Sequence, residues 1–379
     1  MEACKQRIKR AVRELSFDPV LLAALAAAAV SAQFVPPSKK YLGYLDIRVL
    51  CLLLSLMLTV AGLQKAGVFG YLIRRLLEKV HTTRALAAVL IGICFFSSMF
   101  ITNDVALITF VPLGILLFTQ IQQEKLLIPV IVLQTVAANL GSMLTPLGNP
   151  QNLYLYSLSG MTVRQFVGVM AVPSVLSFLL LAAASLLIRP EPVEVLPQSG
   201  EGPPEVRKTL LWSVLFLFCL LAVLHIVPYG AALTAVLAGG LLFDREVLFR
   251  ADYGLLLTFV LLFLFIGNIR SIPAINQSLS ALVGGRELSV GILLSQVISN
   301  VPAAMLLSKF TADDASLLLG VNLGGLGTLI ASMASVISYK LYAATEGARP
   351  RRYLAVFTGV NLLFLGILWG TVAVYTSMG

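Results

Sequence analysis

The chain has 379 residues, of which 58% are hydrophobic and only 12% are charged, and its formal net charge is +9. A soluble domain carries about 25% charged and about 45–50% apolar residues, so a globule surrounded only by water is excluded. The basic residues are spread over short segments between apolar runs, and this distribution speaks against a nucleic-acid partner.

Apolar segments suited to a bilayer recur along the whole chain and predict an all-α polytopic membrane protein. They fall at about 19–34, 46–63, 86–119, 126–158, 165–188, 209–228, 229–243, 254–269, 285–310, 315–340 and 352–376. The one long polar stretch, 189–208, is rich in Pro, Glu and Gly and predicts a cytoplasmic linker. It separates two halves, 1–188 and 209–379.

Two segments of the first half are too long for one span and are interrupted by polar or helix-breaking residues. The run 86–119 contains Thr102-Asn103-Asp104, and the run 126–158 contains TPLGNPQN at 145–152. Backbone that leaves its helix at membrane depth must be satisfied by protein or water, so both breaks are expected to face inward. We interpret 86–119 as a re-entrant hairpin and 126–158 as a broken transmembrane helix.

The second half repeats this order of elements. The run 285–310 is interrupted by SNVP and predicts a second hairpin, and 315–340 contains NLGGLGTLIAS and predicts a second broken helix. Aligning this Gly-rich tract with NLGSMLTPLGN of the first half pairs Asn139 with Asn322 and Thr145 with Thr328. Chance similarity between Gly- and Leu-rich helices is the alternative explanation, but it does not account for the shared order.

The loop charges predict the orientation in the membrane. If both hairpins return to their starting side, about nine crossings remain, and an odd number of crossings separates corresponding elements, so the two repeats are inverted. Most of the 27 Lys and Arg then fall on one side together with the N-terminus. The positive-inside rule places that side in the cytoplasm and the C-terminus outside the plasma (inner) membrane.

Asn103, Asp104 and Asn300 are expected at the tips of the two hairpins. Asp104 is an acidic residue deep in an apolar segment, where a carboxylate is costly unless it is paired, protonated or bound to a cation. Its alternative role is to cap the helix that follows, and the two roles are compatible.

The tract 145–152 is the most specific signal in the sequence. Two prolines within five residues break the helix, and Gly148 lets the backbone bend so that carbonyls turn toward a site. Carbonyls at the C-terminus of a half-helix suit Na⁺, and the N-terminus of the next half-helix suits an anion. The candidate residues here are Thr145, Gly148 and Asn149, with Thr328 and Ser332 in the second half. The alternatives are a proline kink in the first tract and small residues for helix packing in the second.

The strings FITNDVALITFVPL, TPLGNPQNL, SNVPAA and NLGGLGTLIAS resemble the ion transporter superfamily. This group includes citrate-transporter-like proteins, divalent anion symporters, arsenite permeases and one class of sodium/proton antiporters. The resemblance covers residues 46 to 340 and implies an elevator mechanism in a homodimer. It also implies one Na⁺-type site between the Asn103 tip and the 145–149 break, and a second between the Asn300 tip and the 328–332 break. The tips read Thr-Asn-Asp and Ser-Asn-Val rather than Ser-Asn-Thr, which weakens the case for a dicarboxylate.

The sequence therefore predicts a secondary active transporter of a small anion, a carboxylate or an oxyanion, coupled to Na⁺ or H⁺. The alternatives are an arsenite efflux permease or a Na⁺/H⁺ antiporter of the same fold, and a membrane scaffold without transport activity. No cofactor and no enzyme activity are expected, since the chain lacks nucleotide-binding and metalloprotease motifs and has only two histidines. The expected substrate-binding residues are Asn103, Asp104, Asn149, Asn300 and Thr328. The expected ion-binding residues are Asn103, Asp104, Thr145, Gly148, Asn149, Asn300, Thr328 and Ser332.

Overall fold

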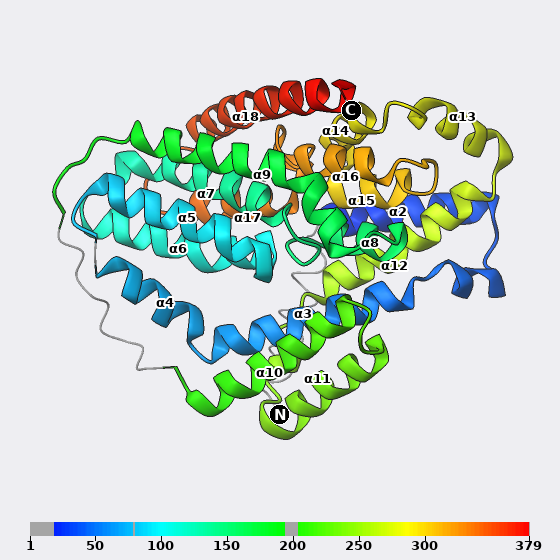
Figure 1. Ribbon diagram of the computed structural model, residues 1–379, viewed down its shortest axis with the longest axis horizontal. Helices are drawn as coiled ribbons and strands as arrows, with labels where there is room; N and C mark the ends of the chain where they lie inside the picture. The colour runs from blue at the N-terminus through cyan, green and yellow to red at the C-terminus, as the bar shows by residue number, and fades with distance from the viewer. Residues whose placement is uncertain (1–18, 79, 194–203, 379) are drawn as a thin grey trace. The chain divides into compact units, whose positions relative to one another are not determined.

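The computed structural model describes residues 19–78, 80–193 and 204–378, and every regular element in these ranges is a helix (Figure 1). Eight of these helices are long and apolar enough to cross a membrane, or nine spans if one bent helix pair counts as a span. The predicted all-α polytopic membrane fold is confirmed. Half of the predicted linker, residues 194–203, lies outside the described residues.

The helices of spanning length differ in part from the predicted crossings. Both arms of the first hairpin, α5 (Thr83–Ile101) and α6 (Asn103–Gln120), are long enough to span by themselves. The predicted crossings α2 (Pro19–Phe34) and α11 (Tyr229–Phe243) are shorter. At 1.5 Å per residue, a 16-residue helix such as α2 measures about 24 Å, which is less than the roughly 30 Å of a hydrocarbon core. Helix length therefore does not decide which segments are re-entrant.

The chain divides into two compact units, and each unit takes one stretch from each side of the linker. The first unit comprises Met1–Val68 with Pro204–Ala281, and the second comprises Phe69–Pro203 with Leu282–Gly379. Corresponding parts of the two halves thus fold together.

The elements of the first unit are α2, η1 (Lys39–Tyr44), α3 (Ile47–Lys65), α10 (Val206–Val223), α11, η3 (Val247–Phe249), α12 (Tyr253–Arg270) and most of α13 (Pro273–Val283). In this unit α10 and α11 pack against α3, and α2 packs against α12. The end of α3 is fixed by Lys65, whose Nζ lies 2.5 Å from Asp244 Oδ1 and 3.0 Å from Glu246 Oε2. Asn268 of α12 donates to Ser31 Oγ of α2 at 3.1 Å, which ties two further helices together.

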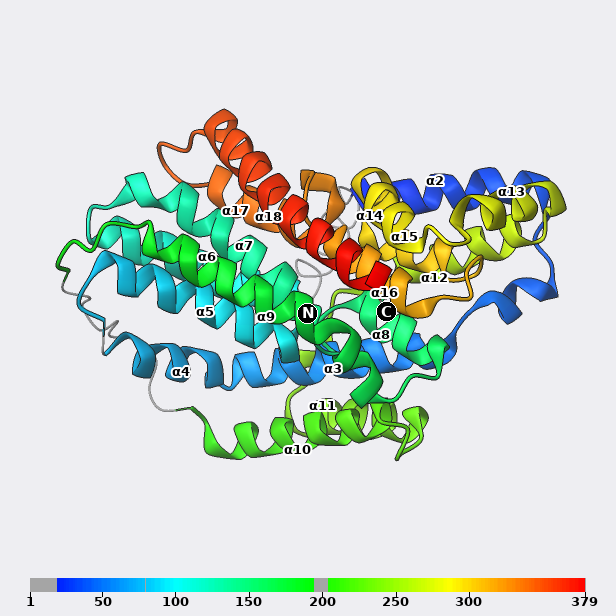
Figure 2. The same ribbon diagram turned by 45° about the horizontal axis from the view of Figure 1, so that its top comes forward.

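The second unit surrounds α7, which is buried along nearly its whole length. Its elements are α4 (Val68–Leu77), α5, α6, η2 (Glu124–Leu126), α7 (Leu127–Ser142), α8 (Pro150–Ser159), α9 (Val163–Leu186), α14 (Glu287–Ile298), α15 (Asn300–Leu307), α16 (Asp314–Leu323), η4 (Leu329–Ala331), α17 (Met333–Ala343) and α18 (Pro350–Met378). Figures 1 and 2 show α7 between α5, α6, α9, α17 and α18, all of which it contacts. A helix that is apolar on every side is expected in such a central position.

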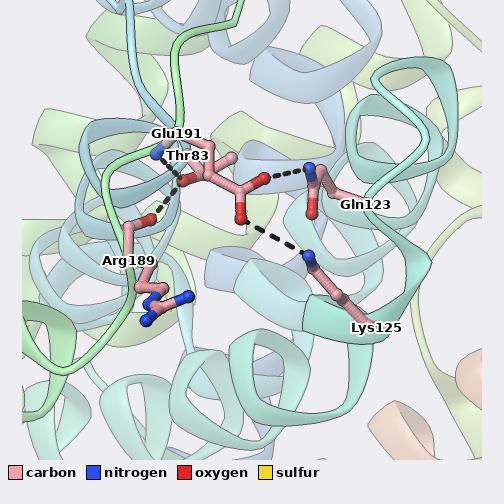
Figure 3. A network of polar contacts seen from close by, with 5 residues as sticks. All are labelled: Thr83, Gln123, Lys125, Arg189 and Glu191. Atoms are coloured by element: carbon pink, nitrogen blue, oxygen red, sulfur yellow. Dashed lines mark hydrogen bonds and ion pairs between the residues drawn. The ribbon is translucent and has the colours of Figure 1, made fainter.

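A polar cluster fastens the open end of the first hairpin (Figure 3). The Glu191 carboxylate, just beyond α9, accepts from Gln123 Nε2 at 2.5 Å and from Lys125 Nζ at 3.4 Å, in the connection between α6 and α7. Thr83, at the start of α5, is buried and exchanges hydrogen bonds with the backbone of Arg189 and Glu191. Both arms of the hairpin are therefore held at the ends that lie away from its tip.

Candidate functional site

Each hairpin turns at one residue with an unusual backbone conformation. Thr102 separates α5 from α6 with φ 60° and ψ 148°, and Ser299 separates α14 from α15 with φ 74° and ψ 154°. Residues other than glycine rarely adopt this region, and each such residue costs on the order of 1–3 kcal/mol. The same strained turn therefore occurs in both halves, directly before Asn103 and Asn300.

Both broken helices are interrupted where the sequence predicts. The first stops at Ser142 and resumes at Pro150, and the second stops at Leu323 and resumes at Met333. Asn149 caps the resumed helix α8 by accepting the N–H of Asn152 at 2.8 Å. A Cβ added at Gly148 would lie 2.0 Å from the Ser142 carbonyl oxygen, so only glycine fits at this bend.

The first hairpin tip contacts the first break directly. The Asn103 N–H donates to the Gly148 carbonyl at 3.1 Å, and Thr145 Oγ1 donates to the Met99 carbonyl at the end of α5. The tip therefore lies at the level of the break, part of the way along the α7–α8 path. This position, rather than helix length, supports a re-entrant path for the hairpin.

The second half makes the equivalent contacts. Thr328 Oγ1 donates to the Gln296 carbonyl at 3.0 Å, and Ser299 Oγ donates to the Ala331 carbonyl at 3.4 Å. Gln296 stands four residues before Asn300, as Met99 stands four before Asn103. The aligned residues Thr145 and Thr328 therefore make the same contact, each with the carbonyl of the residue four positions before the tip asparagine.

Asn139, at the end of α7, joins the first tip to the second break. Its Oδ1 accepts from Asn103 Nδ2 at 3.0 Å and from Ser332 Oγ at 3.0 Å. Its Nδ2 lies 3.5 Å from the Gly325 carbonyl and 3.4 Å from Ser335 Oγ. Asn139 is 4% exposed, so these are buried polar contacts.

Asn322, the partner of Asn139 in the alignment, joins the first break to α16. Its Oδ1 accepts from Asn149 Nδ2 at 3.1 Å, and its Nδ2 donates to Asn152 Oδ1 at 2.6 Å. In the alignment Asn149 corresponds to Ser332 and Asn152 to Ser335. Each half therefore places one asparagine against the break of the other half.

The structure brings most of the predicted site residues together. Asn103, Asn149, Asn300 and Ser332 are all buried at the tips and breaks. The amide of Asn300 faces the backbone of Gly325, since a Cβ added at that glycine would lie 3.0 Å from Asn300 Nδ2.

Three further predicted residues, Asp104, Thr145 and Thr328, are partly or fully exposed. Asp104 lies half-buried in the first turn of α6, and its N–H donates to Asn103 Oδ1 at 3.0 Å. The hydroxyls of the two threonines are bonded to carbonyls, as described above. The binding roles of these residues stay predictions.

Sequence reasoning missed three amides that organise the site, Asn139, Gln296 and Asn322. Asn139 and Asn322 stood in the motifs, and their pairing was a usable signal, because two buried amides at one alignment position require partners. Gln296 gave no signal, because its partners are backbone atoms brought near by the fold.

Several helix N-termini at the site have no side-chain cap. The N-cap residues Thr102 of α6, Ser299 of α15 and Ser332 of α17 make no capping hydrogen bond with their side chains. Uncapped N–H groups and the positive end of the helix dipole suit an anion. Within the described residues, no group of three His, Cys, Asp or Glu side chains is placed to hold a metal ion.

The fold and site define a multi-pass membrane protein with paired hairpins and paired broken helices. Residues 15–337 match the citrate transporter family. The chain belongs to this family and is a membrane transporter.

Two relatives are similar to this chain over most of their length, and a third is similar over a shorter stretch. An inner membrane protein of Escherichia coli (YbiR) is 33% identical over 316 residues, covering 81% of this chain and 83% of the relative. An uncharacterized transporter of Methanocaldococcus jannaschii (MJ0456) is 31% identical over 325 residues, covering 83% and 86%. A Dictyostelium discoideum protein named for the arsB transporters is 29% identical over 129 residues, covering 33% of this chain and 22% of the relative.

Proposed function

We propose that this protein is a secondary active transporter of a small anion, a carboxylate or an oxyanion, coupled to Na⁺ or H⁺. One observation carries the proposal: buried amides of each half contact the break of the other half. Asn139 joins the Asn103 tip to Ser332 of the second break, and Asn322 binds Asn149 of the first break. Membership in the citrate transporter family supports an anionic substrate.

In the proposed mechanism the amides of Asn103, Asn149 and Asn300 bind the anion near the N-termini of the helices that begin at the tips and at the first break. Asp104 either helps to bind the coupling cation or carries the coupled proton. Neutralising the charge of the substrate in this way lowers the cost of moving it through a low-dielectric environment. Thr145, Gly148, Thr328 and Ser332 shape the breaks beside which the coupling ion binds.

The transport cycle is proposed to be an elevator movement in a homodimer. The second unit contains both hairpins and both broken helices, and the first unit contains none of them. This division matches a mobile substrate-carrying part and a fixed scaffold, which would supply the dimer contact. No cofactor and no enzymatic step are needed.

A flux assay in proteoliposomes tests the function. Labelled citrate, succinate, sulfate and arsenite are offered under an imposed Na⁺ gradient or an imposed pH gradient. We expect one anion to accumulate under one of the gradients. Accumulation that does not depend on either gradient would refute the coupling. A pH-driven uptake that persists in Asp104→Asn would rule out this carboxylate as the carrier of the coupled proton.

Arsenite efflux, or exchange of Na⁺ for H⁺, is the second candidate. It is favoured by the similarity to the arsB-named protein and by an acidic residue at the tip that can carry a proton. Arsenite transport with no response to citrate, succinate or sulfate in the same assay would select it.

A further inference from the structure

At the first break, three backbone carbonyls converge on one side-chain nitrogen. Asn152 Nδ2 lies 3.2 Å from the Ser142 carbonyl, 3.2 Å from the Met143 carbonyl and 3.0 Å from the Thr145 carbonyl. The orientation of this amide is set by its other atom, because Asn152 Oδ1 accepts from Asn322 Nδ2 at 2.6 Å. An amide nitrogen has two hydrogens, so three acceptors surround it more closely than ordinary hydrogen bonding requires.

At the second break, a different residue reaches the equivalent place. Gln296 Nε2, on hairpin arm α14, donates to the Gly324 carbonyl at 2.9 Å and to the Leu326 carbonyl at 3.0 Å. Here a backbone group sets the orientation of the amide, since Gln296 Oε1 accepts the Thr328 N–H at 2.9 Å. Gly327 has φ 108°, and a Cβ there would lie 2.2 Å from Gln296 Oε1, so the loop is shaped around this side chain.

The two amides do not correspond in the alignment of the halves. The position equivalent to Gln296 is Met99, and the position equivalent to Asn152 is Ser335. Neither Met99 nor Ser335 carries an amide. The carbonyls of the first break are thus bound by an amide from α8, and those of the second break by an amide from α14. The two contacts are not copies of one contact present in an ancestral half.

We propose that the Asn152 and Gln296 amide nitrogens are built-in substitutes for a cation, and that they keep Na⁺ off the broken-helix carbonyls. A carbonyl cluster at the end of a half-helix is electronegative and would otherwise suit a cation at about 2.3–2.6 Å from each oxygen. The partly positive N–H groups take the point where the oxygens converge. The inference rests on the proposed function, because the carbonyls concerned are those expected to hold Na⁺. It assigns the coupling ion to the tips instead, where Asp104 stands.

The test removes the donor while keeping the shape. In Gln296→Glu and Asn152→Asp, a carboxylate faces the carbonyls, and a cation between them becomes favourable. The purified full chain is unfolded by heat in NaCl or in choline chloride of equal ionic strength, with the exposure of the buried thiols of Cys94 and Cys219 as the signal. We expect both variants to gain Na⁺-dependent stability over the wild type, on the order of 3 °C per tenfold excess over the dissociation constant.

Asn361→Asp is the matched control. Asn361 is also buried, but its Nδ2 donates only to the Phe357 carbonyl within its own helix. This variant is expected to lose stability equally in both salts. A Na⁺ response of Gln296→Glu and Asn152→Asp that is no larger than that of the wild type would overturn the proposal.

Should the carboxylate variants fail to fold in either salt, Gln296→Met decides. It frees the carbonyls without adding a charge, and a Na⁺ response above that of the wild type is again expected, whereas an unchanged response overturns the proposal. Because the readout is stability and not flux, a failure of the transport assay leaves this result interpretable, and the reverse also holds.

Discussion

Single buried amides carry most of the polar contacts between the two halves of the second unit. The side-chain amides of Asn139 and Asn322 each accept and donate hydrogen bonds to residues of the other half's helix break. Both side chains are almost fully buried. A buried polar group that loses its partner costs about 1–3 kcal/mol, so such a network specifies one arrangement of the tips and breaks.

Asn139→Leu is expected to destabilise the protein by about 2–4 kcal/mol, because Asn103 Nδ2 and Ser332 Oγ lose their buried acceptor. Asn361→Leu is the control, since the Asn361 Oδ1 has no hydrogen-bond partner among the described residues and nothing depends on it. Its expected effect stays within about 1 kcal/mol. Thermal unfolding in detergent measures both, and equal losses would contradict the role given to Asn139.

The sequence predicted the residues of the tips and breaks but not all of their partners. Asn103, Asn149 and Asn300 were predicted because a polar residue within an apolar run is costly at membrane depth and is a candidate functional residue there. Gln296 lies only four residues before Asn300 of the second tip, yet it was missed. Its partners are carbonyls from another segment, which no local pattern reveals.

At the scale of elements, the strained turns at Thr102 and Ser299 set the geometry of the hairpin tips. Both residues hold a backbone conformation suited to glycine, and each precedes the first residue of a helix directed into the site. The strain is supported by contacts such as the Asn103 N–H to the Gly148 carbonyl. Strain that persists in the same place in both halves points to a functional constraint.

Thr102→Gly is expected to raise the unfolding midpoint, since glycine adopts this conformation without strain. The gain is about 1–3 kcal/mol, less roughly 0.5–1 kcal/mol for the greater freedom of glycine in the unfolded chain. The variant's transport rate, measured beside its melting curve, shows whether the strain serves the cycle. A lowered midpoint would mean that the threonine side chain stabilises the turn.

The elements themselves were predictable to different degrees. Proline and glycine within long apolar runs located both broken helices, because proline removes a helix hydrogen bond and glycine destabilises a helix interior. The spanning elements were less predictable: α5 and α6 are long enough to cross, whereas α2 and α11 are short. Hydropathy reports only the length and composition of a segment. It cannot predict that a hairpin tip lies beside a helix break.

At the scale of the whole molecule, the two halves are interleaved rather than placed end to end. Each compact unit uses the early part or the late part of both halves. The predicted halves, 1–188 and 209–379, describe the order of elements along the chain, and the units describe how those elements fold together. Sequence reasoning predicted the order of the elements but not the two compact units, because the contacts within each unit join segments far apart in the chain.

The loop charges predict that the two ends of the chain lie on opposite sides of the membrane. A reporter that fluoresces only in the cytoplasm is expected to be bright on the N-terminus and dark on the C-terminus, and a phosphatase that folds only outside is expected to give the reverse pattern. Both ends on one side would mean an even number of crossings, which would contradict the nine crossings predicted from the sequence.

The central claim is that a tip from one half and a break from the other line one anion site. Thr102→Cys and Thr328→Cys are introduced singly into a chain whose four native cysteines are replaced, and the reaction of each new thiol with a maleimide is timed. The account predicts that the transported anion slows the reaction at both positions, at the same concentration. Protection at only one position, or at neither, would contradict a single site shared by the two halves.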